Sequence, residues 1–167
     1  MALSFEDALA RFQCADLTPL SAVLPKPTPE HAGTAEFRKI KKQLGVDLPA
    51  LWKKVLCIRN GAYSVGKKEN TTLDLFIFPA NMIAGTTKGI REEAISQRRS
   101  FPKAWITIAH NVNDADFVVL DTSRKTSDGD SPLLQISHES GRAEERWKSI
   151  ASFLEYAVSG RLNPYQF

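Results

Sequence analysis

Residues 43–61 read QLGVDLPALWKKVLCIRNG, and this stretch predicts two helix boundaries and a reversal of the chain. Gly45 is expected to end one helix, because glycine readily takes the left-handed conformation that follows helix C-termini. Pro49 suits the first turn of the next helix, where a backbone N–H would have no partner in any case. Asn60-Gly61 then favours a turn into a strand, since both residues tolerate positive φ.

Helical periodicity continues on both sides of this stretch. Phe37, Ile40 and Leu44 lie three and four residues apart, and Thr34 is expected to cap the helix that they predict. A closing helix is predicted where apolar residues recur at the same spacing as far as Gly160. Its expected apolar face consists of Trp147, Ile150, Ala151, Leu154, Ala157 and Val158.

The first 33 residues predict a helix followed by an extended arm. Ser4 and Asp7 form a helix start signal, a hydroxyl at the N-cap and a carboxylate three residues on. Residues 18–33 contain four prolines, which lock φ and remove backbone donors. We therefore expect neither a helix nor a central strand in that arm.

Runs of aliphatic and aromatic residues between turn signals predict strands in the second half of the chain. Asp128-Gly129 lies between the last two runs and predicts an antiparallel hairpin. A helix is expected near residues 88–98, between the first run and the second. The four predicted strands span residues 73–78, 105–109, 117–121 and 133–137.

Together these elements predict an α+β domain. We expect an antiparallel sheet of about four to six strands, packed against N-terminal helices and a C-terminal helix. The domain is expected to occupy residues 34–160. Residues 1–33 would pack on it as a helix and proline-rich arm, and residues 161–167 would form a short tail.

The sequence predicts an ordinary globular protein, and we expect it in the cytoplasm because Glu6 and Asp7 stand where a signal peptide would carry positive charge and an apolar core. The 167 residues are 43% hydrophobic and 25% charged, as in ordinary globular proteins, and the net charge is +3. The basic residues fall in short runs on expected helices, without the strong basic footprint of a nucleic-acid reader. No apolar run approaches the ~20 residues needed to span a membrane. We expect neither nucleic acid nor membrane as a partner.

No local motif of catalysis or of metal binding is present. The sequence lacks a P-loop, GxSxG, HExxH and paired CxxC, and its three histidines lie singly. We therefore expect a non-enzymatic protein without cofactor or metal. If an enzyme or ligand pocket exists, Arg59, His110 and Asp121 are its first candidates, because each lies near the end of an expected element.

The remaining special residues are expected to serve the core. Cys14 and Cys57 fall in apolar periodic stretches and are predicted to be small buried hydrophobes. Trp52, Trp105 and Trp147 each fit an apolar face and are predicted to be core residues.

Three features in order resemble the SUKH superfamily. Residues 43–52 are similar to its lG-x-x-LP-x-x-y/w pattern, and Asn60-Gly61 matches its helix-to-sheet turn. Residues 105–121 resemble its strand pair, and residues 152–156 its closing S-F-x-x-f/y helix. Ala115 departs from the family pattern, which has glycine before the aspartate. The family-motif residues, expected to be structural, are Leu44, Gly45, Leu48, Pro49, Trp52, Asn60, Gly61 and Phe153.

The resemblance implies a protein-binding role. Bacterial members typically neutralise a partner toxin, often encoded nearby, and fungal relatives act as interaction hubs in cell-wall regulation. An immunity protein is therefore the leading expectation, and a general scaffold or regulatory module is the alternative. Because an inhibitor of a basic nuclease should be acidic, we expect either a target other than a nuclease or a local acidic face. Its candidate residues are Asp114, Asp116, Asp121, Asp128 and Asp130.

Overall fold

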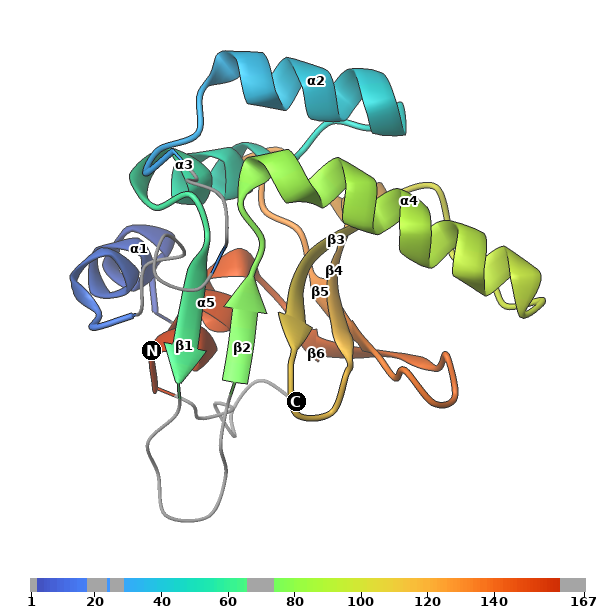
Figure 1. Cartoon of the computed structure of the whole chain (residues 1–167). Helices are drawn as coiled ribbons and strands as arrows, with labels where there is room; N and C mark the ends of the chain where they lie inside the picture. The colour runs from blue at the N-terminus through green and yellow to red at the C-terminus, as the bar shows by residue number, and fades with distance from the viewer. Residues whose placement is uncertain (1–2, 18–23, 25–28, 66–73, 160–167) are drawn as a thin grey trace.

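The computed structural model describes residues 3–17, 24, 29–65 and 74–159 (Figure 1). The described part contains five α-helices, one short 3-10 helix and six strands. The helices are α1 (Phe5–Cys14), α2 (Thr34–Leu44), α3 (Ala50–Ile58), α4 (Ala80–Ser96), η2 (Thr122–Arg124) and α5 (Ile150–Ser159). The strands are β1 (Ala62–Val65), β2 (Asp74–Ile77), β3 (Trp105–Asn111), β4 (Phe117–Asp121), β5 (Leu133–Ile136) and β6 (Ala143–Trp147).

The six strands form one open sheet in the order β1-β2-β3-β4-β5-β6, and every neighbouring pair is antiparallel. The sheet is thus a meander into which α4 is inserted between β2 and β3. This architecture confirms the predicted α+β class and the predicted antiparallel sheet. The four predicted strands lie within two residues of β2, β3, β4 and β5, whereas β1 and β6 were not predicted individually.

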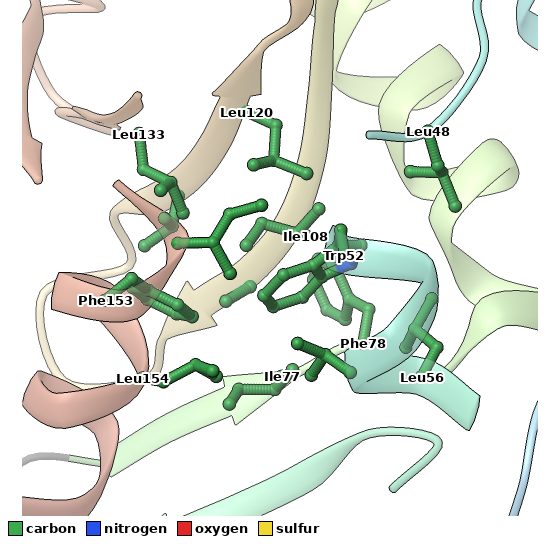
Figure 2. Close-up of a cluster of buried hydrophobic side chains, with 14 of the residues drawn as sticks. Leu48, Trp52, Leu56, Ile77, Phe78, Ile108, Leu120, Leu133, Phe153 and Leu154 are labelled. Carbon is green, nitrogen blue, oxygen red and sulfur yellow. The ribbon is translucent and has the colours of Figure 1, made fainter. Parts of the chain in front are cut away.

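One face of the sheet packs against α3 and α5. Figure 2 shows Trp52 of α3 and Phe153 of α5 pointing toward Ile108 and Leu120 of the sheet. All four side chains are fully buried, and the Trp52 and Phe153 ring centroids lie 5.9 Å apart. Burial of aromatic and aliphatic side chains on this scale supplies most of the stabilisation of such a domain.

The opposite face is partly covered by α4. The backbone N–H of Thr107 in β3 donates to the Thr87 hydroxyl of α4 at 3.0 Å, and both residues are fully buried. Since side chains alternate along a strand, Val119 lies on this face whereas Val118 and Leu120 point to the first. A second, smaller apolar cluster forms here from Val119, Leu134 and Ile136, with Phe101, Trp105 and Ala143 at its edge.

Helix α1 packs against α5, so the N-terminal and C-terminal helices lie together. Ala8, Leu9 and Phe12 are buried, and Arg11 pairs with Glu155 at 3.2 Å. Ser4 caps the helix as predicted, accepting from the Asp7 N–H. Most of the predicted extended arm and all of the predicted tail, residues 161–167, lie outside the described residues.

The predicted helix boundaries around Gly45 and Asn60-Gly61 are confirmed. Gly45 ends α2 with φ 70°, and Gly61 follows α3 with φ 88°. Thr34, however, does not cap α2. The N-cap is Gly33, whose backbone N–H donates to the Glu36 carboxylate at 3.0 Å, and Thr34 is the first helical residue.

The prediction that both cysteines are buried is wrong, because Cys14 and Cys57 are exposed. The buried residues of α3 include Trp52, Val55 and Leu56, and at 100° per residue Cys57 falls on the opposite side of the helix. Cys14 likewise lies on the side of α1 opposite to its buried residues.

Trp147 belongs to β6 and not to the closing helix. It lies opposite Leu133 across a bulge and packs edge-on against Phe153 at 5.2 Å. The helix begins only after the corner at Ser149, where Ser149 and Ser152 exchange backbone and side-chain hydrogen bonds. Trp147 was assigned to the helix because this strand residue also faces the core and lies three residues before Ile150, which is a helical spacing. Trp105 is only half-buried, so of the three tryptophans Trp52 and Trp147 are fully in the core.

Helix α4 is longer than predicted, because it starts at Ala80 rather than near residue 88. Its first N–H, on Ala80, donates to the Asn60 side chain at 2.8 Å. Gly85 and Gly89 weaken the local helix signal, since glycine has low helix propensity. The start of α4 is thus set by a contact with a residue far away in the sequence.

Candidate functional site

An aromatic row crosses the part of the sheet that α4 leaves open. Tyr63 of β1 lies opposite Phe76 of β2, Phe76 opposite His110 of β3, and His110 opposite Phe117 of β4. Directly opposite residues in antiparallel strands present their side chains on the same face. The Tyr63 and Phe76 ring centroids lie 6.3 Å apart, and the His110 and Phe117 rings stack at 5.0 Å.

All four residues of the aromatic row are half-buried. The next row toward α4 runs through Thr107, Val119 and Leu134, which are 0, 0 and 6% exposed. Helix α4 and its neighbours therefore cover that second row and leave the aromatic row partly accessible. A line of ring side chains that stays accessible is typical of an interaction surface, since aromatic residues are enriched at interface centres.

A groove continues the aromatic row toward the C-terminal half of α4. Its apolar lining consists of Phe117, Ile136, Phe101, and Ile90 and Ala94 of α4. Shallow apolar hollows of this kind accept single side chains of a protein partner. The groove shares Phe117 with the aromatic row, so the two surfaces adjoin. The charged residues of its lining are Glu93 and Arg99, and Arg99 donates to the carbonyls of His138 and Glu139.

Among the described residues, two large apolar side chains are exposed: Ile95 of α4 is 68% exposed and Val112 in the β3–β4 turn is 43% exposed. Val112 follows β3 two residues after His110, next to the aromatic row. Ile95 lies elsewhere, because at 100° per residue it points away from the side of α4 that lines the groove with Ile90 and Ala94.

His110, one of the three residues proposed for a chemical role, is part of the aromatic row. Burial lowers its pKa, the neighbouring His138 lowers it further, and Asp116 opposes both. At neutral pH the imidazole is therefore uncharged and stacks on Phe117 as an aromatic ring. The sequence named His110 as a candidate but gave no sign of its ring neighbours.

The five candidate acidic residues do not form one face. Asp114 and Asp116 lie in the β3–β4 turn, whereas Asp121 ends β4. Asp128 and Asp130 precede β5, at the same end of the sheet as Asp121. Because a strand rises ~3.3 Å per residue, Asp116 and Asp121 are separated by roughly 16 Å.

The carboxylates of these residues bind nearby groups of the same chain. Asp116 accepts hydrogen bonds from the Gln135 side chain at 2.6 Å and the His138 N–H at 2.9 Å. Asp130 accepts from the backbone of Ser131 and from Ile150, the first residue of α5. Asp114 accepts from Asn111, and Asp128 from Thr126.

Asp121 takes part in an ion-pair network. Its carboxylate accepts from Arg124 at 2.8 Å, and Arg124 also pairs with Glu145 of β6 at 2.5 Å. Burial alone would raise the pKa of Asp121, but the hydrogen bonds from Ser123 and Arg124 outweigh it and lower the pKa. Burial raises the pKa of Asp130, although the N–H groups of Ile150 and Ser131 oppose the shift.

Arg59 fastens α1 to the domain. Its guanidinium donates to the carbonyls of Gln13 and Ala15 at 2.9 and 3.2 Å and lies 5.5 Å from the Phe12 ring centroid. Arg59, His110 and Asp121 therefore act at three separate places: the end of α1, the aromatic row and the far end of β4. They do not converge on one site.

Most of the family-motif residues are buried or lie at the ends of helices. Asn60 is 5% exposed, donates to the Pro29 carbonyl at 2.9 Å and accepts from Ala80. It thus joins three segments at the corner between α3 and β1. Leu44, Leu48, Trp52 and Phe153 are at most 3% exposed, and Pro49 is the N-cap of α3.

Among the described residues, no three His, Cys, Asp or Glu side chains gather as the ligands of a metal ion would. In the same part of the chain, every helix is too short or too polar to cross a membrane.

A family model matches residues 31–156, three quarters of the chain, and its description is SMI1/KNR4 family (SUKH-1). The chain belongs to the SMI1/KNR4 family, SUKH-1. No curated protein is similar enough in sequence to count as a relative. The SUKH-1 match contains the whole aromatic row and all the motif residues, and it begins after α1. This confirms the resemblance predicted from the sequence.

Proposed function

We propose that this SUKH-1 protein is a non-enzymatic binding protein, an immunity protein that neutralises a partner toxin by stoichiometric contact. The observation that carries the proposal is the aromatic row of Tyr63, Phe76, His110 and Phe117, held half-buried on the open part of the sheet. Family membership supports it, because immunity proteins belong to this family.

The chemistry of the surface favours a protein as the partner. Rings that are already packed side by side lose little conformational freedom on binding, so they provide contact area at low entropic cost. The groove beside Phe117 offers a place for an apolar side chain of the partner. Substrate turnover would instead need convergent polar groups with matched pKa values.

The proposed target is an effector other than a highly basic nuclease. The five acidic candidates lie at two ends of the sheet and bind groups of their own chain, so they do not form an acidic plug. A row of ring side chains suits a partner that also presents apolar and aromatic residues. The toxin is expected to be encoded next to this chain.

Co-expression with the product of the neighbouring gene tests the proposal. We expect restored growth of the host and a stable complex of the two proteins in size-exclusion chromatography. Protection without a complex would contradict stoichiometric neutralisation.

The alternative is a scaffold or regulatory module that uses the same surface. It predicts that the partner captured from the native host is encoded elsewhere and is not toxic. A toxic neighbouring gene product that this chain neutralises would exclude that alternative.

A further inference from the structure

A second surface lies on α2, away from the aromatic row, and it is strongly basic. Six basic and two acidic residues fall between Thr34 and Lys54, a net charge of +4, so the rest of the chain carries −1 of the total +3. The positive excess of the protein is therefore concentrated on α2 and α3.

Three of these cations form what we call the basic face: Arg38, Lys39 and Lys42. Phe37, Ile40 and Leu44 pack toward the interior, and at 100° per residue the basic face points to the opposite side. All three are exposed, and within the described residues none of them has an ion-pair partner.

The neighbouring lysines differ from the basic face because each of them already pairs with a carboxylate. Lys41 and Lys53 pair with Asp47 at 3.4 and 2.7 Å, and Lys54 pairs with Glu6 at 3.3 Å. Burial would raise the pKa of Asp47, but the two lysines outweigh it and lower the pKa. The basic face is thus the part of this positive charge that has no ion-pair partner among the described residues.

A hollow between α2 and α4 adjoins the basic face. Lys39 and Gln43 of α2 and Asn81 of α4 provide polar groups around it, and Ala35 and Ala84 provide apolar surface. One carboxylate also lines the hollow, that of Glu36, but it already accepts the Gly33 N–H at the start of α2. Positive charge, amide groups and small apolar side chains are therefore gathered in one place.

We propose that this surface, the basic face with the adjoining hollow, docks an acidic segment of a protein partner, with carboxylates on Arg38, Lys39 and Lys42 and an apolar side chain in the hollow. Unpaired cations attract a chain of opposite charge, and the hollow adds selectivity for side chains over charge alone. This surface is distinct from the aromatic row, so the inference does not depend on the proposed function.

A protein segment fits better than a nucleic acid. Three free cations would neutralise few phosphates, and the exposed side of α2 has no aromatic ring on which a base could stack. The alanines of the hollow suit an aliphatic side chain instead.

Binding of a fluorescent peptide with Asp and Glu residues between leucines tests the proposal on the full chain at low salt. Reversal of the basic face (Arg38→Glu, Lys39→Glu, Lys42→Glu) is expected to weaken binding at least ~10-fold, because three attractive contacts become repulsive. Ala35→Phe, which fills the hollow and keeps every charge, is expected to weaken it ~5-fold or more through loss of the apolar contact.

The matched control is Lys125→Glu, Arg142→Glu, Lys148→Glu, which changes the net charge equally at exposed positions elsewhere. It should leave peptide affinity within ~2-fold. The proposal is overturned if the peptide does not bind, if both triple variants lose affinity equally, or if Ala35→Phe has no effect. Tighter binding of a single-stranded oligonucleotide than of the peptide would also overturn it, in favour of a nucleic acid.

Discussion

Ala115 occupies a backbone conformation that suits glycine, with φ 56° in the turn between β3 and β4. The resemblance described above places glycine at this position of the family pattern, and Ala115 itself adopts the left-handed conformation that glycine favours. A left-handed conformation costs a non-glycine residue roughly 1–2 kcal/mol. The turn is therefore strained at Ala115.

Ala115→Gly is expected to stabilise the protein by about 0.5–1 kcal/mol, because relief of this strain exceeds the added chain entropy of glycine. The melting temperature should rise by roughly 1–4 °C for a domain of this size. Gly45→Ala, at φ 70°, is the reverse change and should destabilise. A lower melting temperature for Ala115→Gly would show that the turn is not strained.

The pKa shifts of Asp121 and Asp130 have opposite directions and therefore predict opposite pH dependences of stability. The pKa of Asp121 is lowered in the folded state, so its contribution is present above the unfolded pKa of about 3.9 and is lost as pH falls through the folded pKa. The pKa of Asp130 is raised, so its ionisation above pH ~4 opposes folding.

Asp121→Asn should therefore reduce the free energy of unfolding at pH 7 by roughly 1–2 kcal/mol through the weakened contact with Arg124, and by less at pH ~3. Asp130→Asn keeps an oxygen that accepts from Ser131 and Ile150, and it should cost little or stabilise at pH 7. Urea unfolding at both pH values measures the difference. Equal losses for the two variants at pH 7 would contradict the assignment.

At the scale of elements, α1 is an addition outside the region matched by the family model, which begins at residue 31. Arg59 connects α1 to the matched region, since its guanidinium binds the carbonyls of Gln13 and Ala15 at the C-terminal end of α1. Cations at helix C-termini satisfy carbonyls that have no partner within the helix.

Arg59→Ala is expected to destabilise the protein by about 1–2 kcal/mol and to speed hydrogen exchange in α1 more than in α3. The control is Arg11→Ala, which removes a surface ion pair with Glu155 and should cost less than ~0.5 kcal/mol. Unchanged exchange in α1 after Arg59→Ala would mean that apolar packing alone holds the helix.

Elements with local signals could be predicted from the sequence, and elements set by distant contacts could not. Some helix boundaries depend on the boundary residue alone: the positive φ of Gly45 and Gly61, and the side-chain cap of Ser4. The start of α4, by contrast, depends on Asn60 from another segment. The helix that was predicted near residue 88 therefore appeared shorter than it is.

The aromatic row was missed for a related reason. Phe76 and Phe117 looked like ordinary strand residues, because the sequence does not give the register that places them beside His110 and Tyr63. The acidic candidates were chosen by residue type alone, and the structure separates Asp116 from Asp121 by most of a strand. The sequence did contain a clue to one member of the aromatic row. Side chains alternate along β4, and this alternation puts Phe117 on the same face as Val119.

For the whole molecule, the central claim is that the open part of the sheet binds a protein partner. The helices bury one face, and α4 covers only part of the other (Figure 1). The half-buried rings of Tyr63 and Phe117 remain partly accessible, and such rings commonly dominate binding energy.

Calorimetric titration of the purified partner into Phe117→Ala, compared with Val119→Ala, tests this claim most directly. Both changes remove apolar packing, but Val119 is fully buried in the second row, whereas Phe117 is half-exposed in the aromatic row. We predict that Phe117→Ala raises the Kd roughly 10- to 100-fold, and that Val119→Ala lowers stability but changes the Kd by less than ~3-fold. An unchanged Kd for Phe117→Ala in a folded protein would contradict the account.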